Sequence, residues 1–242
     1  MERIAEGRTA EVFAWGDEHI LKLYRAGWGA ENAQHEFEVV KAVEQANIAA
    51  PRAIEQITHE GRYGIVYERA TGITMGDAVR KVIYRFRMYA RKMASLHAEM
   101  HQADCAQLPS QRSRIIRNHP HLLTHLENLP DTCKICHGDF HMENILWDGE
   151  KFTIIDWNDA TCGTPAADVA RSYLLFWLDE KSHNWFIRQI IRMIRNTYLN
   201  HYCELTNTNK ADILAWMPIV ATIRLTENIP NERELLMKWI NP

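Results

Sequence analysis

Long apolar runs are missing from this sequence. Tyr173–Leu178 is typical of its longest apolar stretches, whereas a membrane-spanning helix needs about 20 consecutive apolar residues. The first residues, Met1–Glu6, do not form the apolar stretch of a secretory signal peptide either. We therefore expect a cytoplasmic protein without a membrane partner.

Cysteine is also scarce. The 242 residues include five cysteines, an odd number without regular spacing, which is typical of a reducing compartment and not of a disulfide framework. Cys133 and Cys136 precede His137 in a C-x-x-C-H string, but covalent haem attachment requires export. We expect both cysteines to be small, buried, apolar side chains.

Charge of one sign is not in excess. The chain has 28 basic and 31 acidic residues, a net charge of −3, so it is not a polycation that coats nucleic acid. Hydrophobic residues make up 46% and charged residues 24%, which excludes general disorder, collagen and a small disulfide scaffold. At about 150 residues per domain, the length predicts one or two domains.

The character of the chain changes near residue 72. Before this point the apolar runs are short and β-prone, and a turn joins the first two into a hairpin. Phe37, Val40 and Val43 recur at helical spacing and indicate one helix. The expected elements are hairpin strands at 12–15 and 20–24, a helix at 30–45, and strands near 53–58 and 63–67.

From Gly72 onward the pattern is mostly helical. A small β-rich part followed by a larger helical part with a β insert predicts an α+β protein with two lobes. The expected elements are helices at 74–101 and at 112–128, the latter interrupted or started near Pro120, strands at 134–137, 144–147 and 152–156, and helices at 166–180, 183–205, 209–226 and 231–240.

Three oxygen-bearing side chains stand out in the β insert. Asp139 and Asn144 lie in one short loop between two expected strands, and Asp156 ends the next strand. A hairpin between Asn144 and Asp156 brings these two residues close together. Carboxylate and amide oxygens suit Mg²⁺, which also takes phosphate oxygens, and one carboxylate can then orient or deprotonate a hydroxyl.

The spacing H-x-D-x-x-x-x-N followed by a metal-binding Asp is a phosphotransferase pattern. It is joined here by Ile-Asp-Trp at 155–157 and by Gly-Thr-Pro-Ala-Ala-Asp-Val-Ala at 163–170. In these motifs, and over nearly the whole chain, the sequence resembles the aminoglycoside phosphotransferase and choline kinase group of the protein-kinase-like fold. The resemblance implies a bilobal protein with a small antiparallel β N-lobe and a larger helical C-lobe. It implies transfer of the ATP γ-phosphate, with Mg²⁺, to a hydroxyl of a small molecule.

The same resemblance assigns lobes and roles. It implies a nucleotide-binding lobe at 1–67, a hinge at 68–72, and a helical lobe with the catalytic loop and substrate site at 73–242. Asp139 corresponds to the catalytic aspartate, and His141 is expected to offer a ring N–H near the γ-phosphate. The remaining assignments are Asn144 and Asp156 as Mg²⁺ ligands, and His137 and Asp168 as scaffolding of the catalytic loop.

A nucleotide lobe of this kind needs a lysine on its third strand and a glutamate on the following helix. Lys22 lies among apolar residues on an expected strand, where it requires an anionic partner or an exposed face. Glu31, Glu36 and Glu38 are the candidate partners. The family that the sequence resembles has apolar residues four and seven positions after this glutamate and a proline after the helix, which implies Glu36, with Lys22 on the α- and β-phosphates; a surface Lys–Glu pair is the alternative.

Three further residues are expected to contact ATP. The segment at 5–12 has one glycine where protein kinases carry G-x-G-x-x-G, but its backbone N–H groups and the Thr9 hydroxyl can reach phosphate oxygens. A plain β-turn is the competing interpretation. In the hinge, backbone groups of Glu68 and Ala70 are expected to bond the adenine edge because an extended linker leaves them unpaired, with Tyr67 behind the adenine.

Two other functions fit parts of the sequence. A catalytically silent, nucleotide-binding regulatory module has the same fold, although every catalytic group is present. The basic region at 80–117 is either a solvated surface or a nucleic-acid surface. We expect a small-molecule hydroxyl substrate as the partner, and neither nucleic acid nor a membrane.

Overall fold

The computed structural model describes residues 1–104 and 107–241. It divides the chain into two compact units. The first consists of Met1–Thr74 with Asn144–Asn158, and the second of Met75–Glu143 with Asp159–Pro242. The α+β class expected from the sequence is confirmed, because strands dominate the first unit and helices the second.

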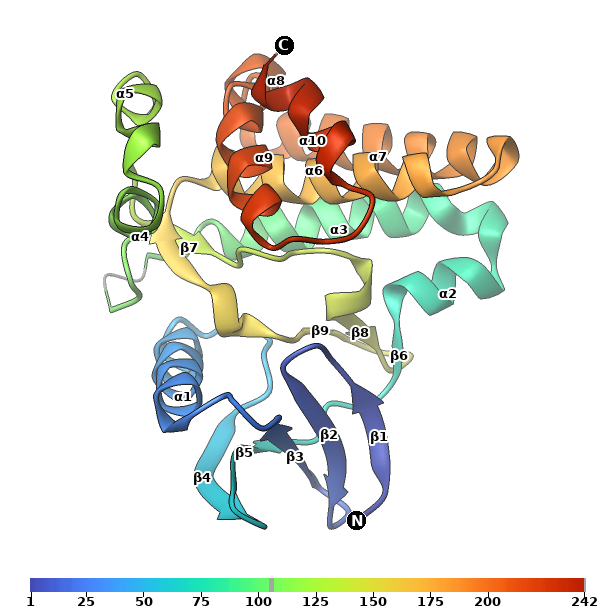
Figure 1. Cartoon of the computed structure of the whole chain (residues 1–242). Coiled ribbons are helices and arrows are strands. Elements are labelled where there is room, and N and C mark those ends of the chain that lie inside the picture. Colours follow the sequence, from blue (N-terminus) through green and yellow to red (C-terminus); the bar gives the residue numbers. More distant parts are fainter. Residues whose placement is uncertain (105–106, 242) are drawn as a thin grey trace. The chain divides into compact units, whose positions relative to one another are not determined.

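The first unit contains a five-stranded antiparallel sheet with the order β1-β2-β3-β5-β4 (Figure 1). Four of its strands and the helix match the expected elements, and β1 was not expected. The bounds are β1 Arg3–Glu6, β2 Ala10–Trp15, β3 His19–Tyr24, α1 Ala30–Gln45, β4 Ala53–His59 and β5 Arg62–Glu68.

Alternation along β3 separates the hydrophobic core of this sheet from its polar face. Leu21 and Leu23 are buried and pack with Val66 in one cluster. Because side chains on a strand point to opposite faces in turn, Lys22 and Tyr24 share the other face. The strand therefore buries leucines on one side and presents an ammonium and a phenol on the other.

A second, three-stranded sheet also belongs to the first unit. Its order is β6-β8-β9, formed by Ile73–Thr74, Ile145–Trp147 and Phe152–Ile154. The backbone N–H of Ile154 also donates to the carbonyl of Ala49 at 2.9 Å. These bonds group residues 144–158 with the N-terminal residues, whereas we expected from the sequence that the stretch 73–242 would form one unit.

The second unit is a layer of helices with a small two-stranded sheet. In Figure 1, α3, α6 and α7 run side by side, and β7 pairs antiparallel with β10. The helices are α2 Met75–Lys81, α3 Phe86–Met100, α4 Gln111–Asn118, α5 Leu123–Leu126, α6 Pro165–Ser182, α7 Trp185–Thr206, α8 Lys210–Leu214, α9 Met217–Thr226 and α10 Arg233–Ile240; the strands are β7 Lys134–Cys136 and β10 Thr161–Gly163.

Three of the expected long helices are broken. The one at 74–101 is interrupted at Val82, whose backbone angles (φ −134°, ψ 63°) are not helical. The helix expected at 112–128 is interrupted before Pro120, as we expected, and the one expected at 209–226 breaks at Ala215 and Trp216, after which Pro218 lies in the first turn of α9, where its missing N–H is tolerated. Among the described residues, none of the helices combines the length and apolar character needed to cross a membrane.

Candidate functional site

Lys22 bridges two carboxylates within the first unit. Its Nζ donates hydrogen bonds to Oε1 of Glu36 and to Oδ1 of Asp156, both at 2.9 Å. The Glu36 side chain is 3% exposed, whereas that of Asp156 is 50% exposed. Burial alone lowers the pKa of Lys22, but the charges of Glu36 and Asp156 raise it above its ordinary value. The structure thus brings together three of the residues selected from the sequence.

Two tyrosines fix the buried Glu36 carboxylate. The Tyr67 hydroxyl donates to Oε1 at 2.7 Å, and the Tyr24 hydroxyl donates to Oε2. Burial, followed by the negative charge of Glu36, raises the pKa of both phenols, so they remain protonated donors. Tyr67, which we placed behind the adenine, therefore supports Glu36. A buried carboxylate with an ammonium and two hydroxyl donors is well satisfied.

Asn144 and Asp156 lie at the two ends of the β8–β9 hairpin. Ile145 pairs with Ile154, and the Ile155 N–H donates to the Asn144 carbonyl at 2.9 Å. Asp156 has a φ of 64°, a left-handed conformation that aspartate tolerates better than most residues. An amide oxygen and a half-exposed carboxylate next to each other form a donor set that fits Mg²⁺ bound to phosphates.

Asp139 lies in the second unit, in the loop after β7. His141 Nε2 is 3.3 Å from its Oδ2, and its backbone N–H donates to His137 Nδ1 at 3.2 Å. The Glu143 N–H donates to His141 Nδ1 at 3.2 Å, so Nδ1 accepts and the ring N–H lies on Nε2, the nitrogen nearest Asp139. The His141 N–H that we expected near a phosphate is therefore directed at Asp139.

The Asp139 carboxylate is held in its ionised form. Burial opposes ionisation, but the hydrogen bond and charge of His141, followed by the charges of Arg171 and His137, lower the pKa of Asp139 to about 2. Such a carboxylate is a weak base that remains charged at neutral pH. It can therefore accept a hydrogen bond from an incoming hydroxyl without first removing the proton.

Arg171 on α6 also reaches Asp139. Its Nη2 lies 3.4 Å from Asp139 Oδ1 and 2.7 Å from Oε1 of Glu227, which follows α9. Glu227 also pairs with Arg224 at 2.6 Å, and Arg224 pairs with Glu232 at 2.7 Å. A chain of alternating charges thus connects the loop at Asp139 to the segment between α9 and α10.

Asp168 anchors the loop that carries Asp139. Its carboxylate accepts the backbone N–H of His137 at 2.6 Å and that of Gly138 at 2.8 Å. Gly138 has a φ of +83°, and a Cβ there would lie 2.6 Å from the carbonyl oxygen of Asp159. This position therefore requires glycine, and the scaffolding role expected for His137 and Asp168 agrees with these contacts.

Two buried histidines complete the surroundings of Asp168. His97 Nε2 lies 3.1 Å and His101 Nε2 lies 3.3 Å from Asp168 Oδ2. Their Nδ1 atoms lie 2.6 Å and 2.8 Å from the hydroxyls of Tyr198 and Tyr202. Burial, followed by the nearby His101, lowers the pKa of His97 to about 3. Neutral His97 therefore donates from Nε2 and accepts at Nδ1, and it packs as we expected.

The segment expected to cover phosphates forms the connection between β1 and β2. The Gly7 N–H donates to the Ala10 carbonyl at 2.8 Å, and the Thr9 carbonyl accepts the Arg25 N–H at 2.9 Å. The backbone is thus a compact hairpin connection, which agrees with the turn interpretation. A contact of the Thr9 hydroxyl with phosphate stays a prediction.

The expected hinge begins at the end of β5. The Glu68 N–H donates to the Arg52 carbonyl at 2.9 Å, and the Glu68 carboxylate pairs with the Arg52 guanidinium. The expectation that this N–H is unpaired was therefore wrong, because the strand pairing continues through Glu68. The carbonyl of Glu68 and the backbone of Ala70 stay predictions for adenine binding.

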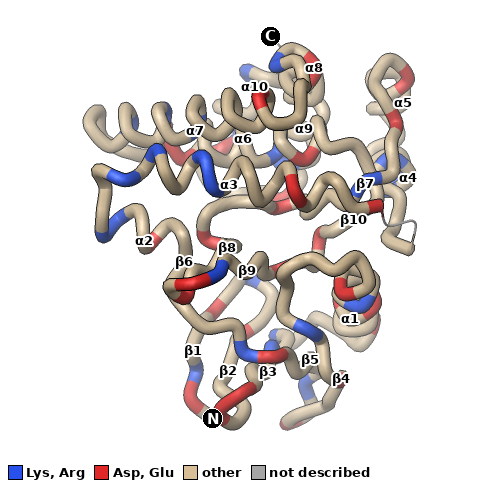
Figure 2. The backbone as a smooth tube through the Cα atoms, turned by 180° about the vertical axis from the view of Figure 1, so that it is seen from behind, with Lys and Arg blue, Asp and Glu red and all other residues tan. Residues whose placement is uncertain are grey.

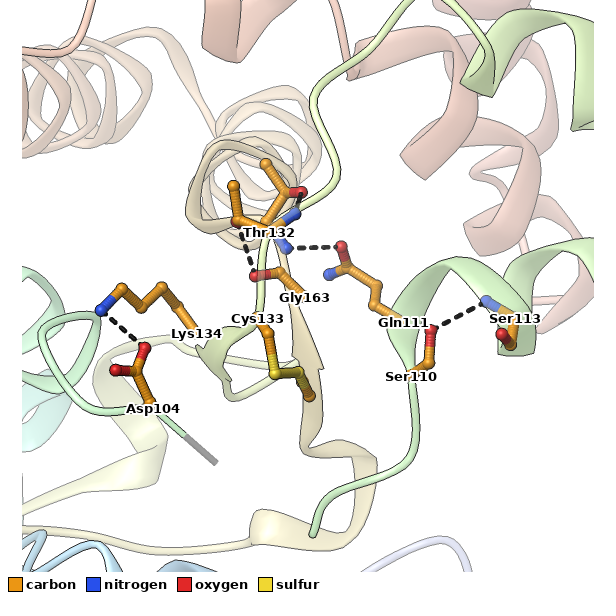
Figure 3. Close-up of a disulfide and its surroundings, with 10 residues drawn as sticks. Asp104, Ser110, Gln111, Ser113, Thr132, Cys133, Lys134 and Gly163 are labelled. Atoms are coloured by element: carbon orange, nitrogen blue, oxygen red, sulfur yellow. Dashed lines mark hydrogen bonds and ion pairs between the residues drawn. A yellow bond between two sulfur atoms is a disulfide. The ribbon is translucent and has the colours of Figure 1, made fainter. Parts of the chain in front are cut away.

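A disulfide joins the strands that flank the Asp139 loop. Cys133, immediately before β7, is bonded to Cys162 on β10, with a Cα–Cα distance of 4.8 Å. Figure 3 shows the bond beside Thr132, whose hydroxyl donates to the Gly163 carbonyl at 3.0 Å. Cys136 is buried as expected, but Cys133 is exposed. The expectation for Cys133 was wrong because it precedes the buried strand.

Tyr24 was not predicted as a partner of Glu36, and Arg171 and Glu227 were not predicted as neighbours of Asp139. Tyr24 follows Lys22 by two positions, which places both side chains on one face of the strand. Arg171 follows Asp168 by three positions and lies on the same helix face. Both signals were present in the spacing.

Comparisons with known proteins agree with this geometry. Residues 1–209 match the sequence model of the phosphotransferase enzyme family. No curated protein matches the chain at a significant level. The chain resembles a thermostable mutant of aminoglycoside phosphotransferase APH(4)-Ia in a ternary complex with AMP-PNP and hygromycin B, at 17% identity and a TM-score of 0.66, covering 98% of this chain and 88% of that chain.

Two other solved structures have the same fold. Macrolide 2'-phosphotransferase MphH from Brachybacterium faecium is 17% identical, with a TM-score of 0.52 over 98% of this chain and 90% of that chain. A choline/ethanolamine kinase family protein from Mesorhizobium loti is 17% identical, with a TM-score of 0.51 over 95% of this chain and 81% of that chain. These likenesses confirm the protein-kinase-like fold.

Proposed function

The chain belongs to the phosphotransferase enzyme family, and from this premise we propose that it transfers the γ-phosphate of ATP to a hydroxyl of a small molecule. Lys22, held between Glu36 and Asp156 at 2.9 Å from each, is the observation that carries the proposal. An ammonium fixed by two carboxylates from separate segments is more than a surface pair, because one of them is buried. We place this activity in the cytoplasm, where ATP is abundant; thiols are kept reduced there, so we expect the Cys133–Cys162 bond to form only under oxidising conditions.

The nucleotide residues all belong to the first unit. Lys22 would contact the α- and β-phosphates. Glu36, whose carboxylate also accepts hydrogen bonds from Tyr24 and Tyr67, holds the ammonium of Lys22 in place. Asn144 and Asp156 would hold Mg²⁺, and the ion would supply neutralisation of phosphate charge. The Thr9 hydroxyl would add a phosphate contact, with Glu68 and Ala70 at the adenine edge.

Asp139 is the residue that acts on the acceptor. With a pKa of about 2, its carboxylate orients the acceptor hydroxyl as a hydrogen-bond acceptor and does not deprotonate it beforehand. The proton passes to Asp139 as the new oxygen–phosphorus bond forms and the bond to the ADP leaving group breaks. His141 and Arg171 hold the carboxylate in place, 3.3 and 3.4 Å away.

A screen for the acceptor tests the proposal. The purified chain is incubated with Mg-ATP and one candidate hydroxyl compound at a time, and ADP is measured with a coupled assay. Similar proteins of known structure, which include an amicoumacin kinase, suggest the first panel: aminoglycosides, amicoumacin, macrolides, choline and ethanolamine. Asp139→Asn is the matched blank, because it keeps the shape of the side chain and removes its charge.

Acceptor-dependent ADP formation that is absent with Asp139→Asn supports the proposal. ADP formation that continues unchanged in this variant contradicts the role of Asp139. Tight binding of Mg-ATP with no turnover on a broad panel of hydroxyl compounds favours the silent regulatory module instead.

A further inference from the structure

The starts of α3 and α7 carry large exposed apolar side chains. Tyr84 is 75% exposed, Trp185 71% and Phe186 64%. Among the described residues thirteen large hydrophobic side chains are exposed, and a concentration of five of them here is a patch that requires an explanation. We call this the α3–α7 surface; its apolar members are Ile83, Tyr84, Met88, Trp185 and Phe186, and its cations are Lys81, Arg85, Arg87 and Arg91.

These residues lie at one end of the second unit. His97 contacts Tyr198 and His101 contacts Tyr202, so residues of α3 lie beside residues 101 positions later on α7. Because this separation is the same for both pairs, the two helices run parallel. The same offset places Phe86 level with Ile187. Figures 1 and 2 view the unit from opposite sides, and both show the starts of α3 and α7 at the same end.

The cations of the α3–α7 surface have no acidic partners. No aspartate or glutamate occurs between Ala78 and Ala98, and Figure 2 shows the basic positions along α2 and α3. Within the described part of the chain, none of the four cations forms an ion pair. The nearest carboxylates by sequence are already engaged: Asp77 with Arg80, Asp179 with His183, and Glu180 with Arg192 and Arg195.

We propose that the α3–α7 surface docks peripherally on a lipid bilayer that contains anionic headgroups. Unpaired arginines and lysines are attracted by anionic lipids, and tryptophan and tyrosine favour the interface between headgroups and acyl chains. Ile83 and Met88 have apolar side chains that gain nothing from a phosphate backbone but are stabilised among acyl chains. The chemistry thus favours a membrane surface over nucleic acid.

This inference revises the expectation that the protein has no membrane partner. That expectation rested on the lack of a long apolar run, which excludes a spanning helix but does not address helix starts that lie on a surface. The α3–α7 surface contains none of the residues assigned to ATP or to Asp139. Docking can therefore be tested separately from phosphotransfer.

Vesicle flotation with the full chain tests the proposal. Vesicles of phosphatidylcholine alone are compared with vesicles that also contain about 30% phosphatidylglycerol. We expect at least tenfold tighter binding to the anionic vesicles, and weakening as salt rises because screening shortens the reach of the cations. The double variant Arg85→Gln/Arg87→Gln should weaken binding about 25-fold, at about fivefold for each cation removed.

A second double variant, Trp185→Ser/Phe186→Ser, should also weaken binding while leaving the salt dependence in place. Trp28→Ser and Arg117→Gln remove an exposed aromatic and an exposed cation elsewhere, and they should bind like the wild type. Because every substituted side chain is exposed, the circular dichroism and melting temperature of each variant should match the wild type.

Three results would overturn the proposal. The first is equal or absent binding to both kinds of vesicle. The second is tighter binding to a short RNA or DNA duplex that is lost in Arg85→Gln/Arg87→Gln. The third is a dimer in light scattering that Trp185→Ser/Phe186→Ser dissociates, since the patch is then an interface between two copies of the chain.

Discussion

The guanidinium of Arg171 lies 3.4 Å from the Asp139 carboxylate. The same nitrogen, Nη2, is 2.7 Å from Glu227, so Glu227 helps to hold the guanidinium beside the carboxylate of Asp139. Arg171 therefore acts as a positioning residue for Asp139, through charge and through the fixed geometry of its planar group.

Arg171→Gln should lower kcat about 10- to 100-fold and leave the KM for ATP within about twofold. The variant loses one of the charges that lower the pKa of Asp139 and the contact that limits its rotation, and small misplacements of this kind are costly. Steady-state kinetics on the acceptor found in the screen measure both constants. Arg192→Gln, which breaks the 2.7 Å pair with Glu180 in the same unit, is the control and should keep the wild-type kcat.

Lys22→Met should weaken Mg-ATP binding and reduce kcat about 100- to 1,000-fold, the usual effect of losing one fixed cationic donor. Glu36→Gln should have a smaller effect in the same direction, because the amide keeps the shape but no longer attracts the ammonium. Lys41→Met removes a partly exposed lysine that pairs with Glu44 on α1, away from the residues assigned to ATP, and should have no effect. Titration calorimetry and turnover should be measured together. Normal binding of Mg-ATP by Lys22→Met would contradict the role of Lys22 at the phosphates.

Protein stability should fall as the pH drops below about 6.5, in part because of His97. Its pKa is about 3 in the folded protein and about 6.5 in an unfolded chain. Folding therefore keeps His97 neutral, and its contribution is complete above pH 6.5 and is lost as the pH falls towards 3. The slope for one such group is about 1.4 kcal/mol per pH unit.

Urea unfolding between pH 4.5 and 7.5 measures this slope. His97→Gln should be less stable at neutral pH and should show a flatter profile than the wild type. His125→Gln removes an exposed histidine and should keep the wild-type slope. A wild-type slope in His97→Gln would show that another group titrates.

The Cys133–Cys162 bond should stabilise the second unit by about 3–4 kcal/mol, from loop closure over a sequence separation of 29 residues. Cys133→Ser should lower the melting temperature under oxidising conditions to the value that the wild type has after reduction. Thiol titration of the denatured wild type should gain two groups after reduction. Cys203→Ser removes a cysteine that is free in the structure and should remain sensitive to reduction.

The sequence predicts the first sheet from local periodicity and the Lys22–Glu36 pair from the pattern of the family that it resembles. That pattern has apolar residues four and seven positions after the glutamate, which Val40 and Val43 satisfy for Glu36, and all three are buried on α1. The two tyrosines that saturate Glu36 could not be assigned in this way. Their role depends on which face of two different strands meets the helix.

Long-range relations account for the other errors. A count of cysteines does not show that β7 and β10 pair, and this pairing is what brings Cys133 and Cys162 together. The expected helix at 74–101 is apolar enough to continue through Val82, and nothing local marks the break. The grouping of 144–158 with the N-terminal residues depends on a strand pair that joins segments about 70 residues apart along the chain.

Titration of Mg-ATP into the wild type, Asp139→Asn and Asp156→Ala separates the two roles on which the proposed function depends: Asp156 serves the nucleotide, and Asp139 serves the acceptor. Asp139→Asn should bind Mg-ATP with nearly the wild-type affinity and lose turnover, while Asp156→Ala should no longer show metal-dependent binding. Unchanged Mg-ATP binding by Asp156→Ala, or full turnover by Asp139→Asn, would show that these roles are wrong.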